Sequence, residues 1–192
     1  MKESKGRAPR TDAAYNRDQL LSVATRVFAS GDPEPSLRAI AREAGVGIAT
    51  LYRHFPTKEA LVDAVYQSQV ARLTAGAREL LDSLAPAEAL RRWMDLFGDW
   101  VATKKGMLPT LLAMVESGEI AHSQTRAELL GAVTHLLDAG RAAGDLRPDV
   151  TAEEVSAGLV GIFAVAARPQ QGGLAHRLLD LFLDGLRPPA RP

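Results

Sequence analysis

Apolar residues recur along the chain at spacings of three and four, and no segment of strand length alternates between apolar and polar residues. Such spacing puts side chains on one face of an α-helix, whereas strands alternate with a period of two. The pattern therefore predicts an all-α chain. Glycine and proline divide it into about nine helices, which we expect over residues 16–30, 37–44, 48–55, 57–84, 86 to at least 101, 107–117, 123–143, 151–168 and 172–187.

Several of the expected helix ends carry residues that stabilise helix termini. Ser36 and Thr57 are placed as N-caps, and Thr151 and Glu154 have the spacing of a capping box. Gly118 and Gly144 follow two of the helices as stop signals. These local signals support the division into helices.

The helices at 37–44 and 48–55 are joined by only three residues, so they must cross at a steep angle. The small residue Ala41 suits the close crossing, and Gly45 suits a left-handed backbone where the first helix reverses. Ile40, Val46 and Leu51 are the apolar residues expected to lock the two helices together. Each position has a steric reason, and the spacing is that of a helix-turn-helix.

The helix at 48–55 is expected to bury Leu51 and Phe55 and to expose its remaining side chains. That exposed set, together with Lys58 at the start of the next helix, offers hydrogen-bond donors for phosphates and small apolar groups for base edges. A solvated surface without function is the alternative for each residue taken alone, but their shared place on one short helix favours DNA. The residues are Ile48, Ala49, Thr50, Tyr52, Arg53 and His54.

The overall charge is zero, but it is unevenly distributed. Residues 1–60 hold 10 Lys and Arg against 7 Asp and Glu, so the end that faces a polyanion is the N-terminal one. The 192 residues contain no cysteine, which excludes disulfides and thiolate metal sites. We find no apolar run long enough for a membrane span and no signal peptide, and we expect a soluble protein of the cytoplasm.

The segment "LLSVATRVFASG…SLRAIAREAGVGIATLYRHFPTKEALVDAV", within residues 17–65, resembles the DNA-binding segment of the tetracycline-repressor (TetR) family of bacterial regulators. The run "IAREAGV…TLYRHFPTKEAL" is highly specific for that family. Two features depart from its pattern: Gly47 stands where many members have a capping Ser or Thr, and "GDPEPS" replaces a Gly-aromatic loop. The resemblance implies a dimeric regulator that binds operator DNA, on the nucleoid of a bacterial cell.

The resemblance also implies roles for individual residues. Thr50, Tyr52, His54 and Lys58 fall where family members contact the DNA backbone. The positions expected near base edges are Ile48, Ala49 and Arg53. Ser36 and Arg38 also fall where members touch DNA, and for Arg38 a solvent-exposed helix residue is the equal alternative.

The larger C-terminal part shows no nucleophile, base and acid arrangement and no phosphate-binding loop, so we expect no catalytic residues and no cofactor. Glu119 and His122 have the Glu-x-x-His spacing of di-iron bundles, and His135 and Asp138 have a similar one. A di-iron site needs two such motifs and two further glutamates. The sequence therefore does not favour a metal site.

Aromatic and methionine side chains are concentrated in one stretch, where the resemblance implies a ligand pocket that acts through the fourth helix. From the sequence alone a core is the favoured interpretation, and few charges accompany the set, which suggests an apolar or aromatic effector. The candidate pocket residues are Trp93, Met94, Phe97, Trp100, Met107, Leu111 and Met114.

The last two helices are more apolar than one buried face requires, so we expect them to pair with a second copy in a twofold homodimer. The candidate interface residues are Leu159, Ile162, Phe163, Leu178, Leu179 and Phe182.

Together these features predict a flexible basic arm (1–14), a helix-turn-helix domain (15–60) and a helical regulatory and dimerisation domain (61–192). We expect a homodimeric regulator, a repressor, that binds a pseudo-palindromic operator and responds to a small-molecule effector. An effector-independent DNA-binding protein of the same fold is the first alternative, and an all-helical enzyme or metal-binding bundle is the remote one.

Overall fold

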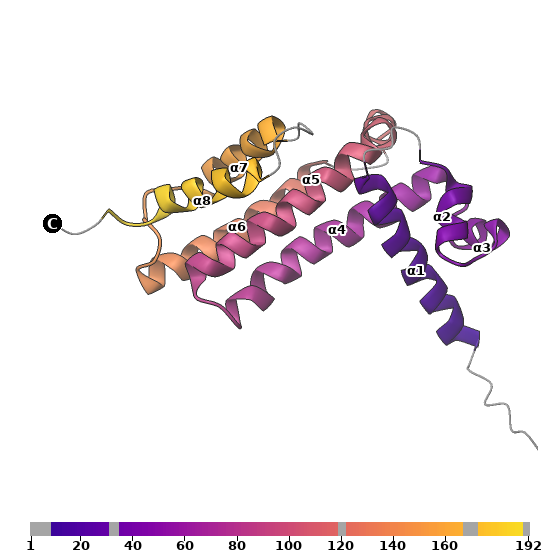
Figure 1. Ribbon diagram of the computed structural model, residues 1–192, viewed down its shortest axis with the longest axis horizontal. Helices are drawn as coiled ribbons and strands as arrows, with labels where there is room; N and C mark the ends of the chain where they lie inside the picture. Colours follow the sequence, from indigo (N-terminus) through magenta and orange to yellow (C-terminus); the bar gives the residue numbers. More distant parts are fainter. Residues whose placement is uncertain (1–8, 31–34, 119–121, 167–172, 190–192) are drawn as a thin grey trace, which may run out of the picture. The chain divides into compact units, whose positions relative to one another are not determined.

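The computed structural model describes residues 9–30, 35–118, 122–166 and 173–189, with the side chains of 9–13, 122 and 123 outside that description. These residues form eight α-helices and no strand (Figure 1). The all-α prediction is therefore confirmed. The helices are α1 (Pro9–Ala29), α2 (Leu37–Glu43), α3 (Ile48–His54), α4 (Lys58–Leu81), α5 (Pro86–Glu116), α6 (His122–Ala143), α7 (Ala152–Ala166) and α8 (Leu174–Leu186).

Helix α1 begins at Pro9, seven residues before its predicted start at Asn16. Proline suits the first position of a helix because its missing N–H would have no partner there. The prediction of a flexible arm over 1–14 is wrong for residues 9–14, which are helical. Residues 1–8 of that arm and the loop at 31–34 lie outside the described residues.

Helix α5 is continuous over 31 residues, where the sequence predicted a break before residue 107. Gly106 and Pro109 lie inside it, and both are poor helix formers. A Cβ built on Gly106 would lie 1.9 Å from the carbonyl oxygen of Phe28 in the last turn of α1. Gly106 is thus a point of close approach between helices, and not a helix end. Buried apolar side chains beyond it, including Met107 and Leu111, stabilise the second half of α5.

The chain forms two compact units, and each is discontinuous in sequence. The first comprises Met1–Gln67 and Ala102–Ile120, and the second comprises Ser68–Val101 and Ala121–Pro192. Helices α4 and α5 therefore contribute residues to both. Residues 61–67 and 102–120 cluster with the helix-turn-helix segment, whereas the sequence placed them in the C-terminal domain. The functional boundary at residue 60 stays a prediction.

The core of the second unit is built around an indole. Trp93 is fully buried, and its Nε1–H donates to the carbonyl oxygen of Leu73 at 2.9 Å, which satisfies its one polar atom. Phe97 lies next to it, with a centroid separation of 5.6 Å, and also contacts Trp100 at 5.2 Å and Phe163 of α7 at 6.1 Å. These contacts link α5 to α4 through Trp93 and to α7 through Phe97.

Capping of α4 and α7 follows the sequence prediction. The Ala60 N–H donates to Oγ1 of Thr57 at 3.1 Å, and Thr151 and Glu154 form both bonds of a capping box, at 2.7 and 3.2 Å. The backbone N–H and the hydroxyl of Thr151 bond the Glu154 carboxylate, and they lower the pKa of that group. None of the described helices is long and apolar enough to cross a membrane.

The contact at Gly106 predicts the stability of two matched glycine variants. Gly106→Ala should lower the free energy of unfolding by about 1–3 kcal/mol, because the new methyl group meets backbone that cannot rotate away. Gly131→Ala in α6, where nothing lies within 4 Å of the added atom, should instead raise it by up to ~1 kcal/mol through helix propensity. Urea unfolding followed by circular dichroism measures both. Equal stability of the two variants would contradict the close approach.

Candidate nucleic-acid interface

The turn between α2 and α3 is closed by a pair of backbone hydrogen bonds. The Val46 N–H donates to the Ala41 carbonyl at 3.0 Å, and the Gly45 N–H donates to the Arg42 carbonyl at 3.1 Å. This pair is the Schellman motif, which needs a left-handed residue after the helix, and Gly45 has φ of 70°. The predicted role of Gly45 is confirmed.

Side chains below this turn hold α3 in place. Ile40 and Leu51 are fully buried, Ala41 and Phe55 are 2% exposed, and α2 packs against both α1 and α3 (Figure 1). Val46, expected to share this core, is only half-buried. The predicted apolar contact between the two helices is therefore present, and it is made by residues within the helices more than by Val46 in the turn.

Helix α3 starts without a side-chain cap, as Gly47 predicts. Gly47 is the N-cap in extended conformation, and its carbonyl accepts from the N–H groups of Thr50 and Leu51 at 2.9 and 3.2 Å. Ala49, Tyr52 and Arg53 are exposed, and the other predicted α3 contacts are half-buried, namely Ile48, Thr50 and His54. All six predicted α3 side chains are therefore at least partly accessible to solvent, and their role as DNA contacts stays a prediction.

A hydrogen bond organises the exposed face of α3, and the sequence reading did not identify it. Nη2 of Arg53 donates to Oγ1 of Thr50 at 3.0 Å, across one helical turn. The i, i+3 spacing was the available signal. Because a hydroxyl both accepts and donates, Thr50 can still give its own hydrogen to a phosphate oxygen.

The other predicted contacts lie at the starts of the helices before and after α3. Ser36 is exposed at the N-cap of α2, and its side chain makes no capping bond, so its hydroxyl is available to a ligand. Arg38 is exposed in the first turn of α2. Lys58 is the first residue of α4, half-buried, and follows the capping residue Thr57. All of the predicted DNA contacts therefore belong to the first compact unit.

One cation near α3 was not predicted at all. The guanidinium carbon of Arg17, on α1, lies 5.4 Å from the ring centroid of Phe55, the residue that ends α3. The two residues are far apart in sequence, and no local spacing links them.

Both parts of the chain match known protein families. Residues 20–65 match the family described as bacterial regulatory proteins, tetR family, and residues 85–188 match the SbtR-like transcriptional regulator C-terminal domain. The chain is 30% identical over 189 residues to the HTH-type transcriptional repressor KstR2 of Rhodococcus jostii (strain RHA1). The alignment covers 90% of this chain and 92% of that protein. The chain belongs to the TetR family.

Solved structures of the TetR family agree with this assignment. The TetR transcriptional regulator SCO0520 from Streptomyces coelicolor is 48% identical, with a TM-score of 0.83 over 91% of this chain and 99% of that one. The TetR transcription regulatory protein from Mycobacterium vanbaalenii is 36% identical, with a TM-score of 0.74 over 94% and 100%. The chain is a DNA-binding transcriptional regulator, and its family is one of regulators rather than enzymes.

The candidate pocket residues of this TetR-family chain are all buried, with exposures of 7% or less. They fall in two groups: Trp93, Met94, Phe97 and Trp100 belong to the second compact unit, and Met107, Leu111 and Met114 belong to the first. Burial is expected of a core and of a pocket wall alike. The pocket therefore stays a prediction.

The candidate dimer residues differ in exposure. Leu159 and Leu179 are already buried within the chain, so they have little surface to lose to a partner. The half-buried members are Ile162, Phe163, Leu178 and Phe182. The large apolar side chains with most surface on α7 and α8 are instead Val160, Val165 and Leu181, at 57%, 55% and 68% exposure.

The structure describes only one of the two candidate metal motifs. Glu119 and the side chain of His122 lie outside the described residues. Among the residues that the structure does describe, which include His135 and Asp138, no group of three or more metal-ligating side chains comes together.

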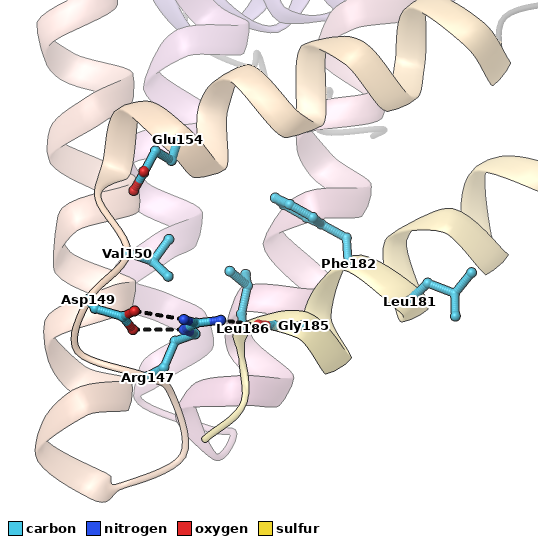
Figure 2. Close-up of a pocket in the computed structure, with 8 residues that line it drawn as sticks. All are labelled: Arg147, Asp149, Val150, Glu154, Leu181, Phe182, Gly185 and Leu186. Atoms are coloured by element: carbon cyan, nitrogen blue, oxygen red, sulfur yellow. Dashed lines mark hydrogen bonds and ion pairs between the residues drawn. The ribbon is translucent and has the colours of Figure 1, made fainter. Parts of the chain in front are cut away.

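A pocket of about 400 Å³ lies between the α6–α7 turn and the end of α8 (Figure 2). Two of its charged groups bind one another: Arg147 donates from Nε and Nη2 to the two oxygens of Asp149 at 2.7 and 2.6 Å. Nη1 of Arg147 donates to the Gly185 carbonyl at 3.4 Å. The backbone N–H of Arg147 donates to the Leu186 carbonyl at 2.9 Å. Arg147 therefore connects the C-terminal end of α8 to the turn between α6 and α7 by hydrogen bonds.

This pairing predicts an acid titration. The hydrogen bonds from Arg147 lower the pKa of Asp149 from 3.8 to about 2, so the stabilisation is complete above pH 3.8 and is lost as the pH falls toward 2. Carboxyl-carbon NMR should find Asp149 still largely ionised at pH 3. In Arg147→Gln its midpoint should move back toward 3.8. An unchanged midpoint in that variant would contradict the pairing.

Proposed function

We propose that this regulator binds a pseudo-palindromic operator as a homodimer, placing α3 of each copy in a major groove, and that it is a repressor whose DNA affinity changes with a small-molecule effector. One observation carries the DNA-binding mode. Two buried side chains, Leu51 and Phe55, fix a seven-residue helix, while its donor side chains remain exposed or half-buried. Repression is supported by the similarity to a repressor over 90% of the chain.

The proposed residues divide into two roles. Phosphates are bound by Thr50, Tyr52, His54 and Lys58, with Ser36 beside them, and these contacts set affinity and orientation. Base edges are read by Ile48, Ala49 and Arg53, with Arg38 at the margin. Arg53 is the strongest candidate for reading, because its hydrogen bond to Thr50 directs the side chain along the exposed face.

Dimerisation is proposed through α7 and α8, which pack against each other (Figure 1). Val160, Val165 and Leu181 each leave more than half of an apolar side chain exposed, which is costly without a partner. In this proposal Leu159 and Leu179 belong to the subunit core, and half-buried Ile162, Phe163, Leu178 and Phe182 complete the contact surface.

Selection of bound DNA from a random pool tests the operator and the dimer together. The enriched sequences should contain an inverted repeat whose half-sites are about 34–36 Å apart, because twofold symmetry supplies the second reading helix. Light scattering at micromolar concentration should give the mass of two chains. Enrichment of single, unrepeated sites, or a monomeric mass, would refute the proposed mode.

The effector proposal rests on the aromatic side chains of the second unit. Trp93, Met94, Phe97 and Trp100 are buried in the first half of α5, and none of the four side chains is charged, which suits an apolar or aromatic ligand. Met107, Leu111 and Met114 belong to the core of the first unit, and the proposal assigns them no ligand contact. An effector-independent regulator of the same fold is the alternative.

Tryptophan fluorescence can decide between these two. Trp93 and Trp100 are the only tryptophans in the chain, so a ligand that enters this region should change the emission directly. The same compound should raise the melting temperature and weaken operator binding. If a broad set of apolar and aromatic compounds changes neither emission nor operator affinity, the effector-independent alternative holds.

A further inference from the structure

Arg17 lies at the end of the recognition helix although it belongs to another element. Its guanidinium carbon is 5.4 Å from the ring centroid of Phe55, and that ring is 6.3 Å from the ring of His54. Phe55 is buried, whereas Arg17 is exposed. Helix α1 thus places a positive charge beside the last turn of α3.

Arg17 differs from Arg26, which is also on α1, in the group that its guanidinium contacts. Arg26 is paired with Glu43 at 3.0 Å, so a carboxylate takes its charge and its donors. In the part of the chain that the structure describes, Arg17 faces an aromatic ring and has no carboxylate within 4 Å. A guanidinium that stacks on a ring keeps its edge N–H groups directed outward.

We propose that Arg17 binds a DNA backbone phosphate next to the C-terminal end of α3. The proposal rests on the proposed function of α3 and adds a residue of α1 to the operator contacts. Phe55 positions the guanidinium beside the last turn of α3, where the described residues give its charge no carboxylate partner. A guanidinium bonds phosphate oxygens through two N–H groups at once, and a preformed orientation lowers the entropy lost on binding.

A purely structural role makes a different prediction for salt dependence. A side chain that only covers Phe55 would change operator affinity by the same factor at every ionic strength. A phosphate contact releases counterions, so each one adds about 0.9 to the slope of log affinity against log salt. The slope therefore separates the two roles.

The experiment measures affinity for the selected operator between 50 and 200 mM salt. Arg17→Met keeps an unbranched stem over Phe55 but removes the charge, and Arg17→Gln is a second neutral variant. For both, the ratio of wild-type to variant affinity should fall about three- to fourfold across this range. Arg17→Lys should retain the wild-type slope. Arg26→Gln, on the same helix, is the control for a change of net charge. For this variant the ratio of wild-type to variant affinity should stay constant across the salt range.

Replacement of single operator phosphates by neutral methylphosphonates gives a second measurement. One position should weaken wild-type binding and leave Arg17→Met unaffected, because the variant has already lost that contact. A constant affinity ratio across the salt range, or the absence of such a position, would overturn the proposal. If the wild-type protein itself selects no DNA, the proposed function fails instead, and that result is distinguishable from a failure at Arg17.

Discussion

The candidate nucleic-acid interface depends on the burial of Leu51 and Phe55. A helix of seven residues is far too short to be stable in isolation, because nucleation costs more than its few hydrogen bonds return. Its conformation is therefore imposed by the two side chains that it inserts into the first compact unit. Burial of two such side chains contributes about 3–6 kcal/mol before entropic costs. Every donor on the other face has a defined direction only because these two residues are fixed.

The turn at Gly45 adds the second constraint. Leu51 can enter the core only if α2 reverses within three residues, and the Schellman bonds of Gly45 and Val46 hold that reversal. The space around Gly45 is open, so its requirement is purely one of backbone conformation. Packing fixes the position of α3, and backbone geometry fixes its angle.

Local chemistry explains which features could be predicted. Gly45, Thr57 and Thr151 act on residues within four positions of themselves, so their spacing contains the whole signal. The helix-turn-helix around Gly45 could be predicted for the same reason, and the family resemblance points to the same segment. The continuity of α5 could not, because Gly106 signals a break locally and meets Phe28 only in the folded chain. Arg17 and Phe55 are likewise joined by packing alone.

The sharing of α4 and α5 between the two compact units has a consequence for chimeras of this fold. A DNA-reading module cut out after residue 60 would lose the segment at 102–120, and with it the glycine against which the end of α1 packs. Transplanting the first compact unit onto another regulator would therefore need three junctions, one within α4, one within α5 and one after residue 120. A single crossover would join incompatible halves of one core.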